Sequence, residues 1–214
     1  MSLFIIVALP FLGALLPGLM NSAGRSACAG VTFAVSLAAF VGLLTNLPMV
    51  LEGEVVTARV DWMPALGLNF TLMLDGLGFF FALLILGIGL LIIIYARHYL
   101  SREDPVGQFY TYLLLFQGAM VGIVLSDNIL MLVVFWELTS LSSFLLIGYW
   151  KHLPEGRQGA RMALTVTGMG GLAMIGGMLL LGQIVGGVVD LVAEEPGEHW
   201  VESLCESLFG LGIS

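Results

Sequence analysis

Charged residues are scarce in this sequence. They make up 10% of the 214 residues, whereas hydrophobic residues make up 59%. About a quarter of the residues in a soluble globular domain are charged. The scarcity therefore excludes an ordinary soluble domain and predicts an all-α integral membrane protein. The net charge of −8 does not predict a nucleic-acid site, because much of the acid lies in the loop before Asp75 and in the tail after Asp190.

Cysteine and catalytic motifs are also lacking. Cys28 and Cys205 are the only two cysteines, which is too few for a disulfide framework or a metal cluster. The sequence has no Ser-His-Asp arrangement, zinc-ligand spacing, Walker loop or dinucleotide fingerprint. We therefore predict no catalytic residue, no metal and no cofactor, and no hydrolytic or redox active site in this chain.

What the sequence does have is long apolar segments. Each is about as long as the 17–25 residues that a membrane-spanning helix needs. The first lacks a basic start and a cleavage site and is expected to be a retained helix. The six predicted spans are Leu3–Met20, Ala27–Val50, Gly76–Ala96, Val106–Ser126, Asn128–Trp150 and Met162–Val189.

The basic residues predict how these spans are oriented. If successive loops alternate sides, six of the seven basic residues fall on one side and only Arg59 falls on the other. Cytoplasmic loops carry the excess of lysine and arginine. We therefore expect the chain in the cell (inner) membrane, with the N-terminus, the Arg59 loop and the C-terminal tail outside. The six residues on the cytoplasmic side are Arg25, Arg97, Arg102, Lys151, Arg157 and Arg161.

The loop at residues 51–75 is patterned like two strands. Apolar and polar residues alternate from Val56 to Trp62 and again from Leu68 to Leu74, and Met63–Gly67 between them supplies turn residues. This pattern predicts a β-hairpin in the outer loop between the second and third spans. An isolated hairpin is marginally stable, so we expect it to pack on its own helices or on a neighbouring subunit.

Glu137 is the one acid inside the fifth span. Counted from Asn128, it lies roughly 13 Å into a slab about 30 Å thick. A carboxylate there costs about 2.5 kcal/mol or more, so it indicates a functional site that uses a proton, a cation or water. Thr139, Ser140 and Ser143 follow around the helix as a polar arc. Two interpretations of this arc stay open: the hydroxyls surround Glu137 with hydrogen-bonding groups, or they bond back to carbonyls of their own helix.

Other polar and small residues allow a transport or a packing interpretation. Gln117 and Gln183 could hydrate a path, although hydrogen bonds between helices are the simpler role. Arg161 begins the sixth span, where it could reach toward the fifth or extend to the membrane surface. Asp75 and Asp127 could act in transport or be favourable charges near helix N-termini. Three glycine patterns indicate close helix packing, with a hinge as the alternative for the last: Gly118-x-x-x-Gly122, Gly182-x-x-x-Gly186 and Gly168–Gly177.

The fifth span carries a family resemblance. Residues Ser126–Trp150, with Phe135-Trp-Glu-Leu-Thr-Ser-Leu-Ser-Ser143 at their centre, closely resemble the fifth-helix motif of the A subunit of Mrp-type multisubunit Na+/H+ antiporters. They resemble more distantly the antiporter-like subunits of respiratory complex I. Gly67–Gly78 and Tyr95–Leu100 resemble the entry and the end of the third helix of that superfamily. The resemblance covers roughly Leu3 to Gly186.

The resemblance implies a mechanism and a fold. In that family the fifth-helix glutamate, here Glu137, pairs with a lysine on the seventh helix, and movement of the lysine loads or unloads a proton on the acid. The fold is a helical bundle with inverted five-helix repeats, the first starting at the fourth helix. The implied partners are the other membrane subunits of the antiporter complex, protons and Na+.

Two features depart from the family pattern. The only lysine, Lys151, lies in a loop, and residues Val188–Ser214 look like a short acidic amphipathic helix. The missing lysine and further helices are then expected from another chain, or the subunit is a shortened one. We expect this division: residues 1–50, helices 1 and 2; 51–75, external hairpin loop; 76–126, helices 3 and 4; 127–189, helices 5 and 6 and the start of the antiporter-like core; 190–214, acidic tail.

Three functions remain open at this stage. The first is a membrane subunit, or its N-terminal part, of a cation/proton antiporter, which is a transporter and not an enzyme. The second is a proton-pumping membrane subunit of a complex I-like or membrane hydrogenase complex. The third is a truncated structural subunit without transport activity.

Overall fold

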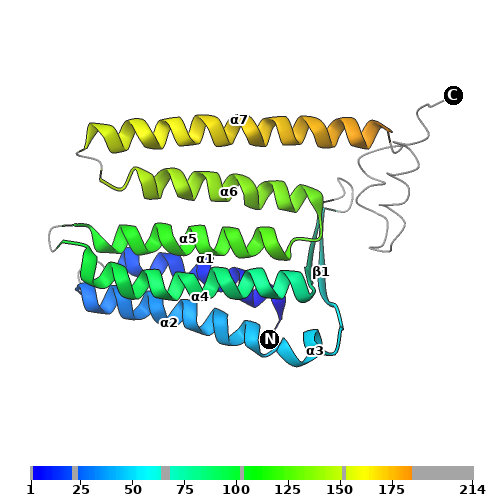
Figure 1. Ribbon diagram of the computed structural model, residues 1–214, viewed down its shortest axis with the longest axis horizontal. Helices are drawn as coiled ribbons and strands as arrows, with labels where there is room; N and C mark the ends of the chain where they lie inside the picture. The colour runs from blue at the N-terminus through cyan, green and yellow to red at the C-terminus, as the bar shows by residue number, and fades with distance from the viewer. Residues whose placement is uncertain (1, 21–23, 64–67, 102–103, 151–152, 185–214) are drawn as a thin grey trace.

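The chain is described from a computed structural model, which covers residues 2–20, 24–63, 68–101, 104–150 and 153–184. Lys151, residues 64–67 of the predicted turn, and the acidic tail predicted at residues 190–214 lie outside these ranges. In the described part, six long helices lie side by side and a two-stranded sheet lies near one end of them (Figure 1). The elements in chain order are α1 Leu3–Leu19, α2 Arg25–Leu44, α3 Leu47–Leu51, β1 Val56–Met63, β2 Leu68–Leu74, α4 Gly76–Tyr99, α5 Val106–Leu125, α6 Ile129–Ile147 and α7 Pro154–Ile184.

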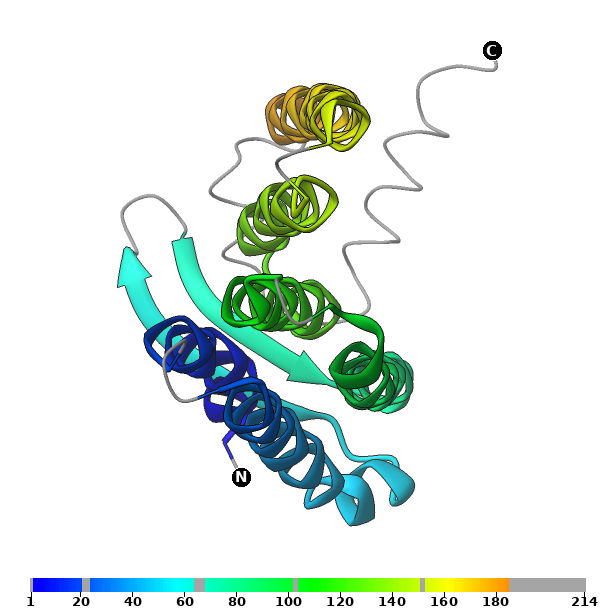
Figure 2. The same cartoon turned by 90° about the vertical axis from the view of Figure 1, so that its left-hand side faces the viewer.

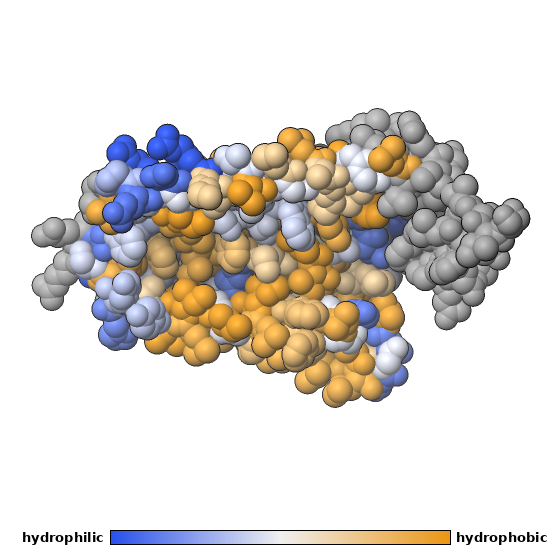
Figure 3. All heavy atoms as spheres, turned by 45° about the horizontal axis from the view of Figure 1, so that its top comes forward, coloured by the Kyte–Doolittle hydropathy of each residue, from blue (hydrophilic) through white to orange (hydrophobic). Residues whose placement is uncertain are grey.

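Four of these helices, α2, α4, α5 and α6, are long and apolar enough to cross a membrane. Helix α1 is also apolar but has 17 residues. Figure 3 shows hydrophobic side chains over the middle of one face and hydrophilic residues toward its ends, most densely where α7 begins. The protein is therefore mostly helical with several apolar helices, and the count of six spans stays a prediction.

Helices α5, α6 and α7 form a row, and α1, α2 and α4 pack on the far side of α5 (Figure 2). Helix α5 contacts α1, α6 and α4, whereas the main contact of α7 is with α6. Helix α7 is thus the edge of the described structure, and large apolar residues on it, including Met162, Val166, Met169 and Leu172, are exposed.

Side-chain caps set where two helices begin. A carboxylate oxygen of Asp75 accepts a hydrogen bond from the Gly78 N–H at 2.6 Å at the start of α4. The amide oxygen of Asn128 accepts from the Leu130 N–H at 2.9 Å at the start of α6. Each cap satisfies an N–H group that has no carbonyl partner in the first turn.

Two helix boundaries differ most from the sequence expectation. The expected helix Ala27–Val50 ends as α2 at Leu44, and α3 follows it. At this break the side chains of Thr45 and Asn46 both donate hydrogen bonds to the Gly42 carbonyl. In addition, Pro48 has no backbone N–H with which to continue the helical hydrogen bonds of α2. The last helix begins at Pro154 instead of Met162, because its first two turns are polar and an apolar pattern cannot detect them.

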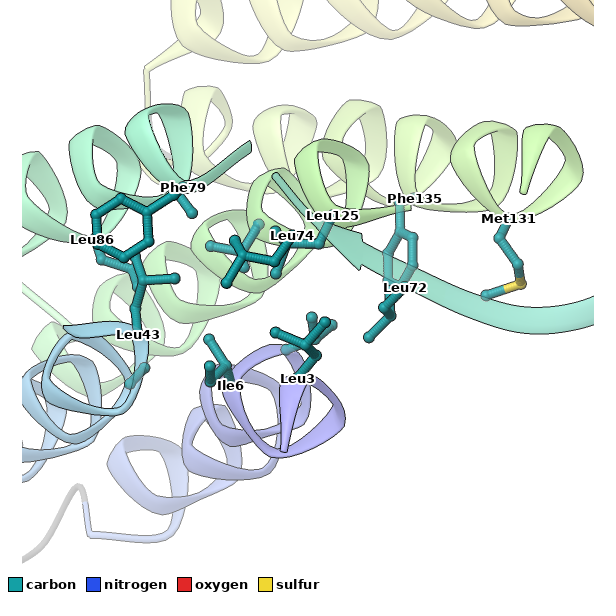
Figure 4. Packing of buried hydrophobic residues seen from close by; sticks show 14 residues of the cluster. Leu3, Ile6, Leu43, Leu72, Leu74, Phe79, Leu86, Leu125, Met131 and Phe135 are labelled. Atoms are coloured by element: carbon teal, nitrogen blue, oxygen red, sulfur yellow. The ribbon is translucent and has the colours of Figure 1, made fainter. Parts of the chain in front are cut away.

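Strands β1 and β2 pair antiparallel, from Val56 opposite Leu74 to Met63 opposite Leu68, with an irregularity between Asp61 and Met63. The apolar face of β2 covers helix ends, where Leu72 and Leu74 are almost fully buried. They pack with residues of α1, α4, α5 and α6, among them Leu3, Ile6, Phe79, Leu125 and Phe135 (Figure 4). The Asp127 N–H also donates to the Thr71 carbonyl at 3.1 Å, so β2 is tied to the connection between α5 and α6.

Candidate functional site

Glu137 lies on the side of α6 that meets α7. The side chain is partly buried, and its Oε1 atom is fully buried with no hydrogen-bond partner among the described residues. A Cβ atom at Gly171 of α7 would overlap this carboxylate. The carboxylate therefore lies directly against the backbone of α7, in a space that exists because residue 171 has no side chain.

The hydroxyls near Glu137 are bonded to their own helix. Thr139 Oγ1 donates to the Trp136 carbonyl at 2.7 Å, and Ser140 Oγ donates to the same carbonyl at 3.2 Å. Ser140 is buried, whereas Thr139 and Ser143 are partly buried. Bonding of this kind satisfies a hydroxyl without a partner on another helix. The geometry thus matches the back-bonding interpretation for Thr139 and Ser140.

Sequence reasoning did not single out Ser142, which the structure buries more deeply than Ser140. Its hydroxyl donates to the Leu138 carbonyl at 2.7 Å. Gly171 was also missed as an individual residue. The only sequence signal for it was the glycine-rich stretch Gly168–Gly177, which does not say which glycine meets Glu137.

Gln117 lies apart from Glu137, in the group of helices α2, α4 and α5. Its Oε1 accepts a hydrogen bond from Ser36 Oγ at 2.7 Å, and its Nε2 donates to the Leu86 carbonyl at 3.5 Å. A Cβ at Gly89 would overlap the Gln117 amide, so this glycine makes the room for it. Gln117 therefore joins three helices, which is the packing role considered for it.

Arg161 is also remote from Glu137. It is exposed, and its Nε donates to the Arg157 carbonyl one turn earlier at 3.3 Å. Ten residues separate it from Gly171, which is roughly 15 Å along a helix. A cavity of about 360 Å³ lies beside it, lined by Phe144, Leu145, Gly148, Arg157, Ala160 and Arg161. The side chain of Gln183 lies outside the described residues.

The two aspartates differ in environment. Asp75 caps α4, as described above. Asp127 precedes α6, and burial raises the pKa of its carboxyl above the ordinary value of 3.8. The fold thus favours the neutral form of the Asp127 carboxyl relative to the unfolded chain.

Tyr149, just after α6, is a further group that sequence reasoning missed. Its hydroxyl is buried with no hydrogen-bond partner among the described residues. Twelve residues separate Tyr149 from Glu137, so this buried phenol is not part of the Glu137 site.

Two family models match the chain. Residues 62–110 match the N-terminus of chain 5 of NADH-ubiquinone oxidoreductase (complex I). Residues 126–213 match the transmembrane family of NADH:quinone oxidoreductase and the Mrp antiporter. The second match extends to residue 213 and so runs into the tail at residues 188–214.

Curated relatives match over most of this chain. It is 50% identical over 186 residues to a probable K(+)/H(+) antiporter A/B subunit of Rhizobium meliloti, which covers 87% of this chain and 18% of the relative. It is 46% identical over 180 residues to the Na(+)/H(+) antiporter A1 subunit of Staphylococcus aureus, and this match covers 84% of this chain and 22% of the relative. The chain thus spans about a fifth of the length of the relatives it matches.

Solved structures agree with these matches. The Mrp complex from Dietzia sp. superposes with a TM-score of 0.77 at 33% identity, over 87% of this chain and 20% of the other. The archaeal membrane-bound sulfane sulfur reductase superposes with a TM-score of 0.73 at 18% identity, over 86% of this chain and 28% of the other. The second likeness shows a shared fold alone.

Proposed function

Because this chain belongs to the NADH:quinone oxidoreductase/Mrp antiporter superfamily and is homologous to the N-terminal part of the antiporter A subunits, we propose that it works in a multisubunit cation/proton antiporter. It would be a membrane subunit, or the N-terminal part of one, and a transporter component instead of an enzyme. Its partners would be the other membrane subunits. The relatives are named for Na+ and K+, and Na+ is the exchanged ion we propose from the resemblance.

Glu137 is the observation that carries the proposal. It is an acid inside an apolar helix, and one of its oxygens is buried without a hydrogen-bond partner among the described residues. Such a group is costly in a membrane unless it takes up a proton or gains a partner from outside the described helices. Glu137 is thus suited to bind and release a proton in the transport path.

The proposed topology has six spans, α1, α2, α4, α5, α6 and α7, with the sheet on the outer side. The two ends of the helices differ in charge, which supports it. Arg25 at the start of α2 bonds to the Arg97 carbonyl near the end of α4, and α7 begins at the same end (Figure 1). Arg59 lies on β1 at the opposite end. By the positive-inside rule, the arginine-rich end would be cytoplasmic. The division into residues 1–50, 51–75, 76–126, 127–189 and 190–214 follows this topology.

A proton-pumping subunit of a complex I-like assembly is the second candidate. The match of residues 62–110 to a complex I family is the observation that favours it. The two candidates use Glu137 in the same way and differ in the process to which proton movement is coupled, which is cation exchange in the first and a redox reaction in the second. Cation-dependent proton movement without an electron donor separates them.

The test is antiport in everted vesicles from sodium-sensitive cells, followed with a pH-sensitive dye after addition of Na+ or K+. The chain is produced with the products of its neighbouring genes, as the wild type and as Glu137→Gln. Glu155→Gln serves as the matched control, because Glu155 is exposed in the first turn of α7. We expect cation-dependent proton movement in the wild type and the control, and its loss in Glu137→Gln. Equal activity of all three in assembled complexes would refute the role of Glu137.

A further inference from the structure

The contact between Glu137 and Gly171 suggests a second residue that acts in the same site. Gly171 is buried, and a Cβ atom there would overlap Oε1 of Glu137 and come within 2.9 Å of its carboxyl carbon. Distances below about 3.0 Å do not occur between such atoms unless one of them moves. Any side chain at residue 171 would therefore displace the carboxylate.

The neighbouring glycines do not share this property. A Cβ at Gly168, Gly170, Gly176 or Gly177 would meet nothing within 4 Å in the described structure. Of the glycines that the structure describes between residues 168 and 177, Gly171 is thus the one at which an added Cβ atom would contact another side chain. Ordinary helix packing accounts for a small residue against an apolar side chain, but here the group in contact is a carboxylate.

The face of α7 against Glu137 gives Oε1 space but no hydrogen bond among the described residues. Oε1 has no partner among the described residues, and a glycine offers no side-chain donor. An oxygen held in this way keeps an unused capacity to accept a proton or a hydrogen bond.

We propose that Gly171 is a positioning residue of the proton site, which fixes the Glu137 carboxylate against α7 and so sets its distance from the group that exchanges protons with it. This inference rests on the proposed function of Glu137. A displacement of about 1 Å in a reacting group can lower a rate by about a hundredfold. The single methyl group of alanine is large enough to cause such a displacement.

The variants that test the proposal are Gly171→Ala, Gly170→Ala, Glu137→Asp as a reference, and the double variant Gly171→Ala with Glu137→Asp. Alanine is a better helix former than glycine by about 1 kcal/mol, so neither single alanine variant weakens α7 itself. Gly170→Ala is the matched control, with the same chemical change one residue away in open space. Aspartate is one methylene shorter than glutamate, so in the double variant the carboxyl group retreats from the added methyl group.

All variants are measured in the antiport assay with the full set of subunits, normalised to the amount of assembled complex in the membrane. We expect Gly171→Ala to lose activity about tenfold or more, Gly170→Ala to keep it, and the double variant to be more active than Gly171→Ala. A purely structural role for Gly171 would not give this rescue by a shorter acid.

The results also separate this inference from the function on which it rests. If Glu137→Gln is inactive while Gly171→Ala is as active as the wild type, the site stands and the role of Gly171 is refuted. Equal losses in Gly171→Ala and Gly170→Ala, or no gain in the double variant, would refute it as well. If Glu137→Gln itself is fully active, the proposed role of Glu137 is refuted, and the inference about Gly171 loses its basis.

Discussion

The Ser36 hydroxyl on α2 donates a 2.7 Å hydrogen bond to Oε1 of Gln117 on α5, and the Gln117 amide in turn reaches the Leu86 carbonyl on α4. Both side chains are almost fully buried. Three helices thus share one polar connection in an otherwise apolar region. Such bonds between membrane helices are worth about 0.6 kcal/mol on average and up to about 2 kcal/mol.

Ser36→Ala should therefore lower the free energy of unfolding of the complex in detergent by about 1 kcal/mol, because it leaves the Gln117 oxygen without its donor. Thr32→Val is the control, since the buried Thr32 hydroxyl bonds only to the Cys28 carbonyl of its own helix in the described structure. We expect a smaller loss for Thr32→Val. Equal losses would mean that the bond between the helices adds nothing to stability.

A second prediction concerns the close approach of α5 and α6 at Gly122. A Cβ there would overlap the ring of Phe135, which is held by Phe11 and Phe70 at ring-centre distances of 6.3 and 6.0 Å. Gly122→Ala should destabilise the protein by about 1–3 kcal/mol through overpacking. Gly87→Ala, where the new Cβ would lie 3.7 Å from Phe40, should be neutral or slightly stabilising. Thermal unfolding distinguishes them, and a stable Gly122→Ala variant would contradict this packing.

A third prediction concerns the end of α4. Arg25 Nη2 donates to the carbonyls of Arg97 and Leu100, which lack partners within the helix. Arg25→Met should cost about 1 kcal/mol and speed hydrogen exchange at residues 97–101. Arg25→Lys should restore only part of the loss, because an ammonium group lacks the fork of the guanidinium.

Arg161→Met is the control for this experiment, since Arg161 donates its hydrogen bond to a carbonyl of its own helix. It should leave exchange at residues 97–101 unchanged. If Arg25→Met also leaves that exchange unchanged, the cap is not formed in the membrane.

The sequence predicts local features of this protein better than contacts between helices. Residue alternation indicates strands at Leu68–Leu74 because side chains on a strand point to opposite faces, and Leu72 and Leu74 are buried there as this pattern requires. An acid in an apolar run singles out Glu137 because the cost of burying charge is visible in composition alone. The resemblance to the Mrp-type family is confirmed by the relatives and the solved Mrp complex.

Contacts such as Glu137 with Gly171 and Ser36 with Gln117 could not be predicted in the same way. They depend on how one helix is rotated and shifted against another, and the six-helix pattern leaves both free. The break between α2 and α3 was missed for a different reason. It arises from the bonds of Thr45 and Asn46 to the Gly42 carbonyl, which hydrophobicity does not measure.

The last prediction concerns pH. Burial raises the pKa of Asp127 in the folded protein above 3.8, so the fold favours the neutral carboxyl. Its contribution to stability is then complete below the pKa of the unfolded chain and is lost as the pH rises through the higher folded pKa. Asp127→Asn removes this titration while keeping the size of the side chain. The difference in thermal midpoint, variant minus wild type, should therefore grow as the pH is raised from about 4 to 7. A difference that is flat or shrinks over this range would show that the Asp127 carboxyl is not desolvated where β2 meets the start of α6.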